Sequence, residues 1–332
     1  MALSEFALIE RYFRGAGVHR ADVVVGIGDD GAVLDVPAGA QLVAVVDSLV
    51  EGVHFPAGSP AASIGHRALA VNLSDLAAMG ARPAWALLAI TLRQADERWL
   101  EAFAAGFSAL AAAHQVALVG GDTTAGPLSV TVQALGFVAP GRALLRSGGH
   151  ADDELYVTGS PGDAACGLRL EQGECAVTAH AHAQAAGSEL RRRFLYPSPR
   201  VEWGTALVGW ASAAIDVSDG LLGDLGKLAA ASGCGAAIDV ERLPLSPSLI
   251  EVAGREGAEH FALTGGDDYE LLFAVPPDRA THFAAHARTA GIACRAIGRL
   301  TLGGAVVARR GGSVIQVSHS GFDHFAGRGA AP

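Results

Sequence analysis

The stretch Gly26-Ile27-Gly28-Asp29-Asp30-Gly31 follows the apolar run Val23–Val25 and decides how the rest of the chain is interpreted. The same pattern, aspartates set among glycines or polar residues, recurs at five later points. These are Val46–Ser48, Asn72–Asp75, Gly120–Thr123, Asp216–Gly220 and Gly265–Tyr269. Carboxylates brought together repel and raise each other's pKa, so a fold that gathers them has to supply cations. Hard divalent ions such as Mg²⁺ suit oxygen ligands. The sequence therefore predicts loops that bring Mg²⁺ to a polyphosphate.

The opening stretch also has the spacing of a dinucleotide-binding loop, G-x-G-x-x-G after a strand. That loop needs a helix after its third glycine, with the helix N-terminus facing the pyrophosphate. Here residues 32–36 predict a second strand, and Pro37 and Gly39 then interrupt the chain. Two aspartates inside the loop would also repel a bare pyrophosphate. We therefore reject the dinucleotide-binding interpretation.

Composition limits the partners. A length of 332 residues suggests two domains. The formal net charge is −10, and the 24 lysines and arginines include a single lysine, Lys227. No basic tract is present, so nucleic acid and acidic membrane surfaces are not expected partners. An acidic protein that binds a polyanion needs a metal ion to do so.

The four cysteines are scattered without C-x-x-C spacing, which favours reduced thiols over a disulfide framework or a thiolate metal site. The N-terminus lacks the basic and apolar regions of a signal peptide. The longest apolar run, Ala84–Ile90, is too short to span a bilayer. These features predict a soluble cytoplasmic protein.

Hydrophobic patterning and turn residues place the secondary structure. In the first half, strands are expected at about 22–27, 32–36, 41–47, 84–92, 116–119 and 128–138. Helices are expected after Ser4, with Phe6, Ile9 and Phe13 on one face, from the cap Ser59 and Pro60 to about Met79, and over 96–113 with Asp96 as cap. In the second half, strands are expected at 154–158, 213–217, 236–240, 271–275, 292–297, 303–308 and 313–317, and helices near 162–171, 200–211, 220–232 and 277–290. Helices and strands mix without regular alternation in the first half, which predicts an α+β fold. They alternate more in the second half, where an α/β-type domain and an α+β domain both stay open. We expect an N-terminal domain of residues 1–147 and a C-terminal domain of residues 148–332, linked near Gly141–Gly149.

Several acids stand where a strand ends. Gly121 allows the backbone to approach a ligand closely, so that Asp122 can meet a metal on that ligand, although a Gly-Asp turn is the simpler interpretation of this pair alone. Asp216 falls at the end of an apolar strand, where a lone carboxylate is costly. Ser218 and Asp219 follow it and could simply be N-cap residues.

Other positions support a metal and phosphate site. Asp47 ends an apolar strand, and Asp75 lies near a helix C-terminus, where the helix dipole disfavours an anion. His54 follows the Asp47 loop and is equally well explained as a surface histidine. Arg146 lies in the expected link between the domains and suits a bidentate phosphate clamp, with an ion pair to an acid as the simpler alternative. Phe322 is most simply a packing aromatic.

Two common nucleotide motifs are missing. Gly226-Lys227 is followed by Leu228 and lacks the upstream glycine spacing of a Walker A sequence. The glycine-rich loop of protein kinases and its downstream partners are also absent. A phosphate enzyme without either motif has to use a different fold.

Seven motifs in order resemble one family. They are Gly26–Asp30, Asp47–Phe55, Ala70–Ala81, Val119–Thr124, Ile215–Leu221, Gly265–Leu271 and Gly321–Phe325. Together they run through nearly the whole chain and resemble the thiamine-monophosphate kinase family, in the superfamily of aminoimidazole ribonucleotide synthetase. This resemblance implies ATP-dependent phosphorylation of thiamine monophosphate to thiamine diphosphate. It also implies a homodimer in which two N-terminal sheets join into a barrel, with the nucleotide between that surface and the C-terminal domain.

The resemblance also implies roles for single residues. The expected Mg²⁺ ligands are Asp30, Asp47, Asp75, Asp122, Asp216 and Asp219. Expected ATP contacts are Gly121, Asp122, Arg146 and Ser218, and expected contacts to thiamine monophosphate are His54, Asp267 and Phe322. No general base is expected, because the acceptor phosphate is already ionised near pH 7.

The chain departs from the family pattern in two places. Val45-Val46 stand where relatives often have hydroxyl residues, which puts one metal position in doubt. Asp267 stands where many relatives have Glu, and the neighbouring Asp268 could serve in its place. Two other functions stay open from the sequence: an aminoimidazole ribonucleotide synthetase-like enzyme and a non-catalytic sensor of nucleotide or thiamine phosphate. Turnover of ATP with thiamine monophosphate separates them.

Overall fold

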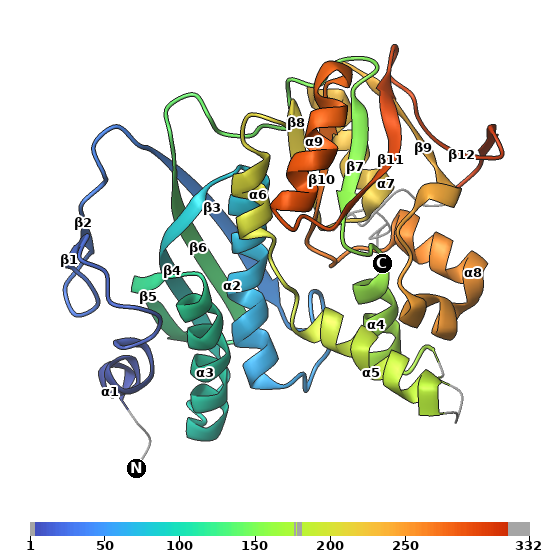
Figure 1. The fold of residues 1–332 in the computed structure, drawn as a ribbon. Helices are drawn as coiled ribbons and strands as arrows, with labels where there is room; N and C mark the ends of the chain where they lie inside the picture. The colour runs from blue at the N-terminus through green and yellow to red at the C-terminus, as the bar shows by residue number, and fades with distance from the viewer. Residues whose placement is uncertain (1–3, 176, 178–180, 318–332) are drawn as a thin grey trace, which may run out of the picture. The chain divides into compact units, whose positions relative to one another are not determined.

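The computed structural model describes residues 4–175, 177 and 181–317. The chain forms two compact units, each with its own sheet. The first consists of Met1–Ala143 with Leu195–Val208, and the second of Leu144–Phe194 with Gly209–Pro332. Figure 1 shows the elements of both in chain order.

The first unit contains helices on one side of a four-stranded sheet. Its helices are α1 (Glu5–Leu8), the π-helical turn η1 (Ile9–Phe13), α2 (Ala61–Ala78), α3 (Glu97–Ala113) and α6 (Val201–Leu207). Its strands are β1 (Val23–Val25), β2 (Val33–Leu34), β3 (Gln41–Val50), β4 (Arg82–Leu92), β5 (Ala117–Ala125) and β6 (Ser129–Val138).

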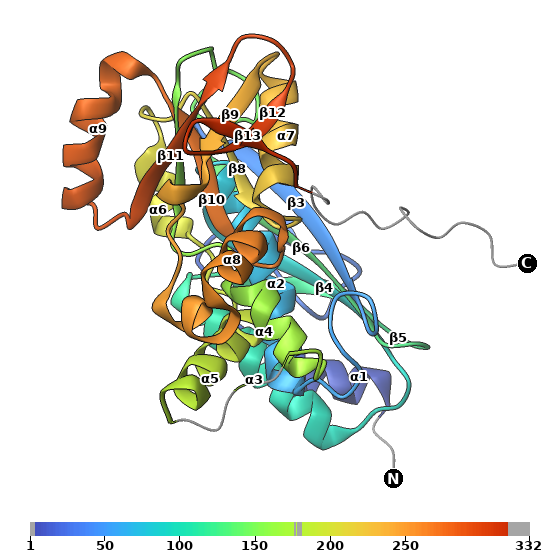
Figure 2. The ribbon, with the colours of Figure 1, turned by 90° about the vertical axis from the view of Figure 1, so that its right-hand side faces the viewer.

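Strands β3, β6, β4 and β5 lie in that order, with β4 and β5 parallel and the other pairs antiparallel. Helices α2 and α3 cover one face of this sheet (Figures 1 and 2). The core beneath them includes the fully buried Trp85, Phe103 and Phe107. Alternate residues of edge strand β3 point to the other face, where Leu42, Val46 and Val50 are exposed. Among the described residues of this unit, no helix covers that second face of the sheet.

The second unit is built on a seven-stranded sheet. Its strands are β7 (Glu154–Thr158), β8 (Ala213–Val217), β9 (Gly235–Asp239), β10 (Glu270–Val275), β11 (Cys294–Thr301), β12 (Val306–Arg310) and β13 (Ser313–Ile315). Its helices are α4 (Asp163–Glu171), α5 (Ala181–Leu195), α7 (Leu221–Ala231), the 3-10 turn η2 (Val240–Arg242), α8 (Pro247–Thr264) and α9 (Pro277–Thr289).

The order in this sheet is β13-β12-β9-β11-β7-β10-β8, and all pairs are antiparallel except β12 with β9. Helix α9 packs on one face through Phe283, which contacts Tyr156 and Phe273. Helix α7 packs on the other face, where Leu225 joins a buried aliphatic cluster with Leu155 (Figure 2). The two units together give the predicted α+β architecture.

Most expected elements are present, with shifts at their ends. Asp96 caps α3 as expected, because its carboxylate accepts from the amides of Arg98 and Trp99. The expected cap of α2 is wrong: the hydroxyl of Ser59 donates to the carbonyl of Pro56, and Pro60 is itself the N-cap residue. The expected apolar face of the N-terminal helix is also wrong at Phe6, which is 82% exposed.

The sequence patterns did not predict helices α5 and α8, and they placed the end of strand β5 too early, at residue 119. Helix α5 is rich in alanine and charge, and α8 contains a non-helical break at Gly254, so neither has a clear apolar period. Strand β5 continues to Ala125, beyond the apolar residues, because it pairs with β4 along that length. Within the described ranges, no helix combines the length and apolar character needed to cross a membrane.

Candidate active site

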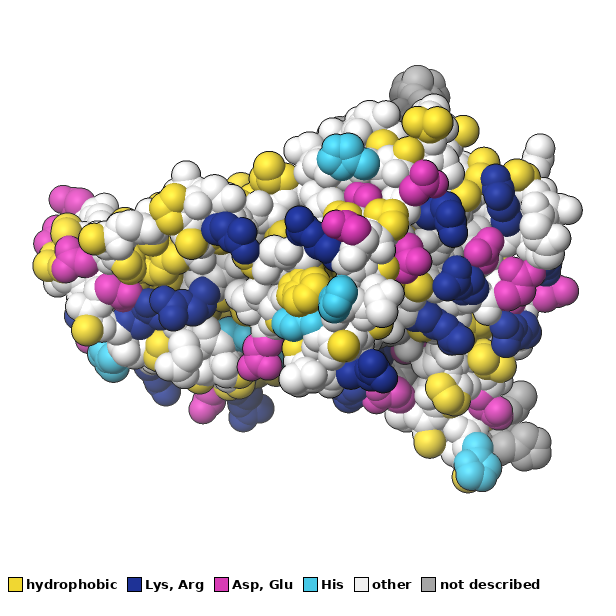
Figure 3. All heavy atoms as spheres, turned by 45° about the horizontal axis from the view of Figure 1, so that its top comes forward, with side chains coloured by type: hydrophobic (Ala, Val, Ile, Leu, Met, Phe, Trp, Pro, Cys, Tyr) yellow, Lys and Arg dark blue, Asp and Glu magenta, His cyan; other side chains and the backbone are white. Residues whose placement is uncertain are grey.

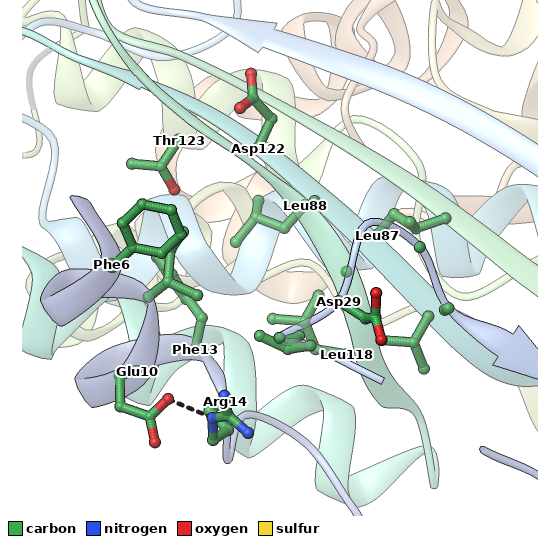
Figure 4. A pocket seen from close by; sticks show the side chains of 18 of the residues that line it. Phe6, Glu10, Phe13, Arg14, Asp29, Leu87, Leu88, Leu118, Asp122 and Thr123 are labelled. Atoms are coloured by element: carbon green, nitrogen blue, oxygen red, sulfur yellow. Dashed lines mark hydrogen bonds and ion pairs between the residues drawn. The ribbon is translucent and has the colours of Figure 1, made fainter. Parts of the chain in front are cut away.

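A cavity of about 790 Å³ lies in the first unit, between the N-terminal helical segment, the loop after β1 and strand β5. Figure 4 shows its lining side chains. Apolar walls come from Phe6, Phe13, Leu87, Leu88 and Leu118, and the acids on the lining are Glu10, Asp29, Asp30 and Asp122. Among the lining residues, all of which the structure describes, Arg14 is the single cation, and it pairs with Glu10. The cavity therefore carries excess negative charge beside an apolar wall.

Gly121 and Asp122 reach this cavity from strand β5. Gly121 has φ +150°, a backbone conformation that side-chain-bearing residues rarely adopt. Asp122 pairs with Ala89, which in turn pairs with Thr131. Thr131 pairs with the exposed Ser48 of β3, and residues directly opposite in a sheet share a face, so Asp122 lies on the face that α2 and α3 leave uncovered.

Asp30 reaches the cavity from the loop between β1 and β2. Its amide donates to the carboxylate of Asp29 at 2.9 Å. Strand β2 follows this loop where a dinucleotide-binding fold would place a helix. The structure therefore confirms the rejection of that fold and brings Asp30 and Asp122, two expected metal ligands, to one cavity.

Asp47 and Asp75 lie elsewhere in the first unit. Asp47 pairs with Val132, which pairs with the buried Leu88, so Asp47 lies on the helix-covered face of the sheet. Asp75 belongs to α2, on that same side. His54 follows β3, and its Nδ1 accepts a hydrogen bond from the amide of Val50 at 3.0 Å. The single chain thus separates Asp47 and Asp75 from the cavity acids.

Asp216, Ser218 and Asp219 occupy the end of β8 and the loop before α7 in the second unit. Asp216 is buried within the strand. Gly220 is the N-cap residue of α7 and no side chain caps the helix, so the interpretation of Ser218 and Asp219 as N-caps is wrong. The carboxylate of Asp219 instead pairs with Lys227.

Arg146 lies in the second unit with an exposed side chain and a fixed backbone. Its carbonyl accepts from the hydroxyl of Ser232 at 2.9 Å, and the carbonyl of Leu145 accepts from the amide of Ala214 at 2.8 Å. These bonds hold Arg146 beside β8 and the end of α7.

Asp267 and Asp268 differ in environment. Both carboxylate oxygens of Asp268 accept backbone hydrogen bonds, from Gly162 at 2.6 Å and Ala164 at 3.0 Å, and burial raises the pKa of this carboxyl well above its usual value. Asp268 therefore fixes the start of α4. Asp267 has φ +70°, and its carboxylate accepts from the hydroxyl of Tyr269 at 3.3 Å. Of the two acids, Asp267 is the one suited to meet a ligand.

Two expectations are left without a structural counterpart. Phe322 lies outside the described residues. Over residues 4–175, 177 and 181–317, no three His, Cys, Asp or Glu side chains are grouped to hold a metal ion. Within the first unit, Asp30 and Asp122 line the cavity, whereas Asp47 and Asp75 lie on the helix-covered side of the sheet. Asp216 and Asp219 belong to the second unit.

Comparison with known proteins identifies the family. Residues 28–138 match the N-terminal domain of AIR synthase related proteins, and residues 150–310 match the C-terminal domain. The thiamine-monophosphate kinase of Salmonella typhimurium is 45% identical over 327 residues, which cover 98% of this chain and 99% of that one. The chain belongs to the thiamine-monophosphate kinase family.

Solved structures of the family agree with the fold. The crystal structure of thiamine-monophosphate kinase from Stenotrophomonas maltophilia has a TM-score of 0.84 at 48% identity, covering 95% of this chain and 99% of that one. The structure of AaThiL complexed with AMPPCP and TMP has a TM-score of 0.75 at 30% identity, covering 98% and 99%. The thiamine-monophosphate kinase interpretation of the sequence is therefore confirmed over the aminoimidazole ribonucleotide synthetase alternative.

In this thiamine-monophosphate kinase family member, sequence reasoning missed Asp224 and treated Lys227 only as a failed Walker lysine. Asp224 lies in the first turn of α7 and is 1% exposed. An acid four residues after a glycine at a helix start is a signal that the sequence does contain. The signal was overlooked because Asp219, directly before Gly220, is the more familiar kind of N-cap candidate.

Proposed function

We propose that the chain transfers the γ-phosphoryl group of ATP to the phosphate of thiamine monophosphate in an Mg²⁺-dependent reaction, giving thiamine diphosphate. The cavity with Asp30, Gly121 and Asp122 carries this proposal. Its volume of about 790 Å³ suits a nucleotide, and its apolar wall suits a base. Its excess of acids suits a nucleotide that arrives with metal ions, since a bare polyphosphate would be repelled.

Mg²⁺ fits the donor set, because all six proposed ligands are carboxylates: Asp30, Asp47, Asp75, Asp122, Asp216 and Asp219. When bound, the ions would neutralise the phosphate oxygens and hold the reacting groups in line. Val46 cannot supply a hydroxyl ligand, and its side chain lies on the open face of the sheet, away from Asp47.

The acceptor requires positioning rather than a base. A phosphate monoester has a second pKa near 6, so the attacking oxygen is already ionised at neutral pH. Arg146 and Ser218 would contact the ATP phosphates, with Arg146 providing bidentate hydrogen bonds to anionic oxygens. His54, Asp267 and Phe322 would contact thiamine monophosphate. No side chain has to remove a proton in this scheme.

We also propose a homodimer that buries the open face of the first unit's sheet. The exposed Leu42, Val46 and Val50 form an apolar row on edge strand β3. A sheet with an exposed apolar face is stabilised when a second copy covers that face. Asp47 and Asp122 of one chain lie on opposite faces of the sheet and are separated. In a dimer, acids of the second copy would supply further metal ligands near each cavity. A cytoplasmic location fits the use of ATP.

The face in Figure 3 shows basic and acidic side chains interspersed, without a broad basic surface. This pattern accords with small anionic substrates rather than nucleic acid.

One assay tests the proposal. The purified chain is incubated with ATP, thiamine monophosphate and Mg²⁺, and thiamine diphosphate is measured by chromatography. Matched reactions contain EDTA, or thiamine in place of its monophosphate. We expect product only with the monophosphate and Mg²⁺. Phosphorylation of thiamine, ATP turnover without acceptor, or equal product in EDTA would contradict the proposal.

A further inference from the structure

A buried carboxylate holds the backbone of the Asp216–Asp219 segment. Asp224, in the first turn of α7, is 1% exposed. Its Oδ2 accepts from the amide of Ser218 at 3.0 Å and the amide of Asp219 at 2.9 Å. Its Oδ1 accepts from Nζ of Lys227 at 2.8 Å. All of these distances are those of good charge-assisted hydrogen bonds.

The simplest alternative is that Asp224 only stabilises the start of α7, since an anion there favours the helix dipole. Its partners argue for more. The two amides belong to the loop before the helix and to Ser218 and Asp219, the proposed ATP and metal contacts. Lys227 also pairs with the Asp219 carboxylate, so both the backbone and the side chain of Asp219 are tied to Asp224.

The same connection continues to the proposed acceptor contact. The amide of Asp267 donates to the carbonyl of Ser218 at 2.8 Å, and the amide of Tyr269 donates to the carbonyl of Val217 at 2.9 Å. A Cβ atom at Gly266 would lie 2.3 Å from the Ser218 carbonyl, so the two loops touch through backbone atoms. A shift of Ser218 therefore has to move Asp267.

We propose that Asp224 is a positioning residue for phosphoryl transfer, which fixes Ser218 and Asp219 for the nucleotide and, through the Ser218 carbonyl, the Asp267 loop for the acceptor. This inference rests on the proposed function. Residues that orient metal and phosphate contacts commonly change affinity or activity by about tenfold to a hundredfold when they are replaced.

The test compares two variants that each turn a buried aspartate into asparagine. Asp224→Asn keeps the volume but presents an amide NH₂ group to backbone or lysine donors. Asp153→Asn is the control: Asp153 is also buried, and its carboxylate accepts from the amide of His150 and the hydroxyl of Ser212. Ser212 precedes β8, at the opposite end of that strand from Ser218.

For both variants, calorimetry measures the Kd of ATP with Mg²⁺ and of thiamine monophosphate, and thermal unfolding measures Tm. We expect Asp224→Asn to raise both Kd values and to lower kcat/KM by about tenfold to a hundredfold. Asp153→Asn should lower Tm comparably while its kinetic constants stay within about twofold of wild type. Equal kinetic constants in the two variants would overturn the inference. An inactive wild type would instead count against the proposed function.

If Asp224→Asn does not fold, Lys227→Met decides the question, because the Lys227 side chain is 42% exposed and can be replaced without unfolding the helix. Loss of its ammonium leaves the Asp219 and Asp224 carboxylates to repel each other. We expect faster amide hydrogen exchange over residues 216–220 and an ATP Kd at least about threefold higher. Unchanged exchange and unchanged affinity would overturn the inference.

Discussion

A Cβ atom on Gly121 would lie 1.8 Å from the carbonyl oxygen of Leu88. Strand β5 thus passes β4 so closely at the cavity that no side chain fits between them. The positive φ of Gly121 independently requires glycine. By contrast, a Cβ atom on the neighbouring Gly120 would meet only the end of the Leu87 side chain, at 3.2 Å. The close approach therefore concerns one of the two glycines.

Alanine at these two positions should give different results. Gly121→Ala has to push β5 away from β4, and we expect a loss of roughly 2–4 kcal/mol in the free energy of unfolding, with ATP affinity reduced. Gly120→Ala should cost less than about 1 kcal/mol, because Leu87 can move. Urea unfolding of both variants measures the difference. Two variants of equal stability would show that the close approach is not a constraint in solution.

A second prediction separates the acids by substrate. Asp122→Asn keeps the side-chain shape but removes a charge from the nucleotide cavity, and should raise the Kd of ATP with Mg²⁺. Losing a charge-assisted contact costs roughly 1.5–3 kcal/mol, or about tenfold to a hundredfold. Asp267→Asn should instead raise the Kd of thiamine monophosphate. Calorimetry with each ligand provides the measurement.

If Asp267→Asn raised the ATP Kd as much as Asp122→Asn did, the two acids would not serve different substrates. Tyr269→Phe provides an independent control, because it removes only the hydroxyl that donates to the Asp267 carboxylate. It should weaken binding of thiamine monophosphate by less than Asp267→Asn does.

Local chemistry explains why much of the fold was predictable. Asp96 before an apolar helical pattern predicted the start of α3, and the apolar runs 154–158 and 213–217 predicted β7 and β8 with their observed bounds. Pairing was not predictable from local sequence. Strand β5 runs past its apolar residues through Asp122 because β4 lies beside it, and that pairing joins residues far apart in the chain.

The site shows the same limit. The motifs predicted Asp122 and Asp47 as candidate metal ligands, but not that they lie on opposite faces of one sheet, since faces depend on register. The sequence also left Asp267 and Asp268 as alternative ligand contacts, and only the structure shows that the amides of Gly162 and Ala164, from another part of the chain, engage Asp268.

A third prediction concerns the proposed dimer. Val46 is 60% exposed on the open face of the sheet, so Val46→Arg should leave the monomer folded while placing a charge in the proposed interface. Leu302→Arg is the matched control, because Leu302 is 90% exposed in the second unit, after β11. Light scattering at micromolar concentration should give a dimer for wild type and Leu302→Arg, and a monomer for Val46→Arg. A dimeric Val46→Arg variant would place the interface elsewhere.

The last prediction follows from a buried acid at the start of α4. The Asp163 side chain is 4% exposed, and burial raises its pKa from 3.8 to about 6. The hydroxyl of Ser246 donates to the Asp163 carboxylate at 2.6 Å, and Arg193 lies 4.0 Å from it; both interactions lower the pKa. The negative charges of Glu270 and Glu189 raise the pKa further. Folding therefore favours the protonated form of this carboxyl.

A pKa raised on folding stabilises the native state fully below about 3.8, and this contribution is lost as pH rises through about 6. Asp163→Asn removes the ionisation, so relative to wild type it should gain stability as pH rises from 4.5 to 7.5. A shift of about two pKa units bounds this pH-dependent gain at roughly 3 kcal/mol, and the weakened Ser246 hydrogen bond lowers the stability of the variant to a similar extent at every pH. Urea unfolding across this range measures the difference between the two proteins. A difference that stays constant with pH would mean that Asp163 is ionised at the same pH in the folded and unfolded chains.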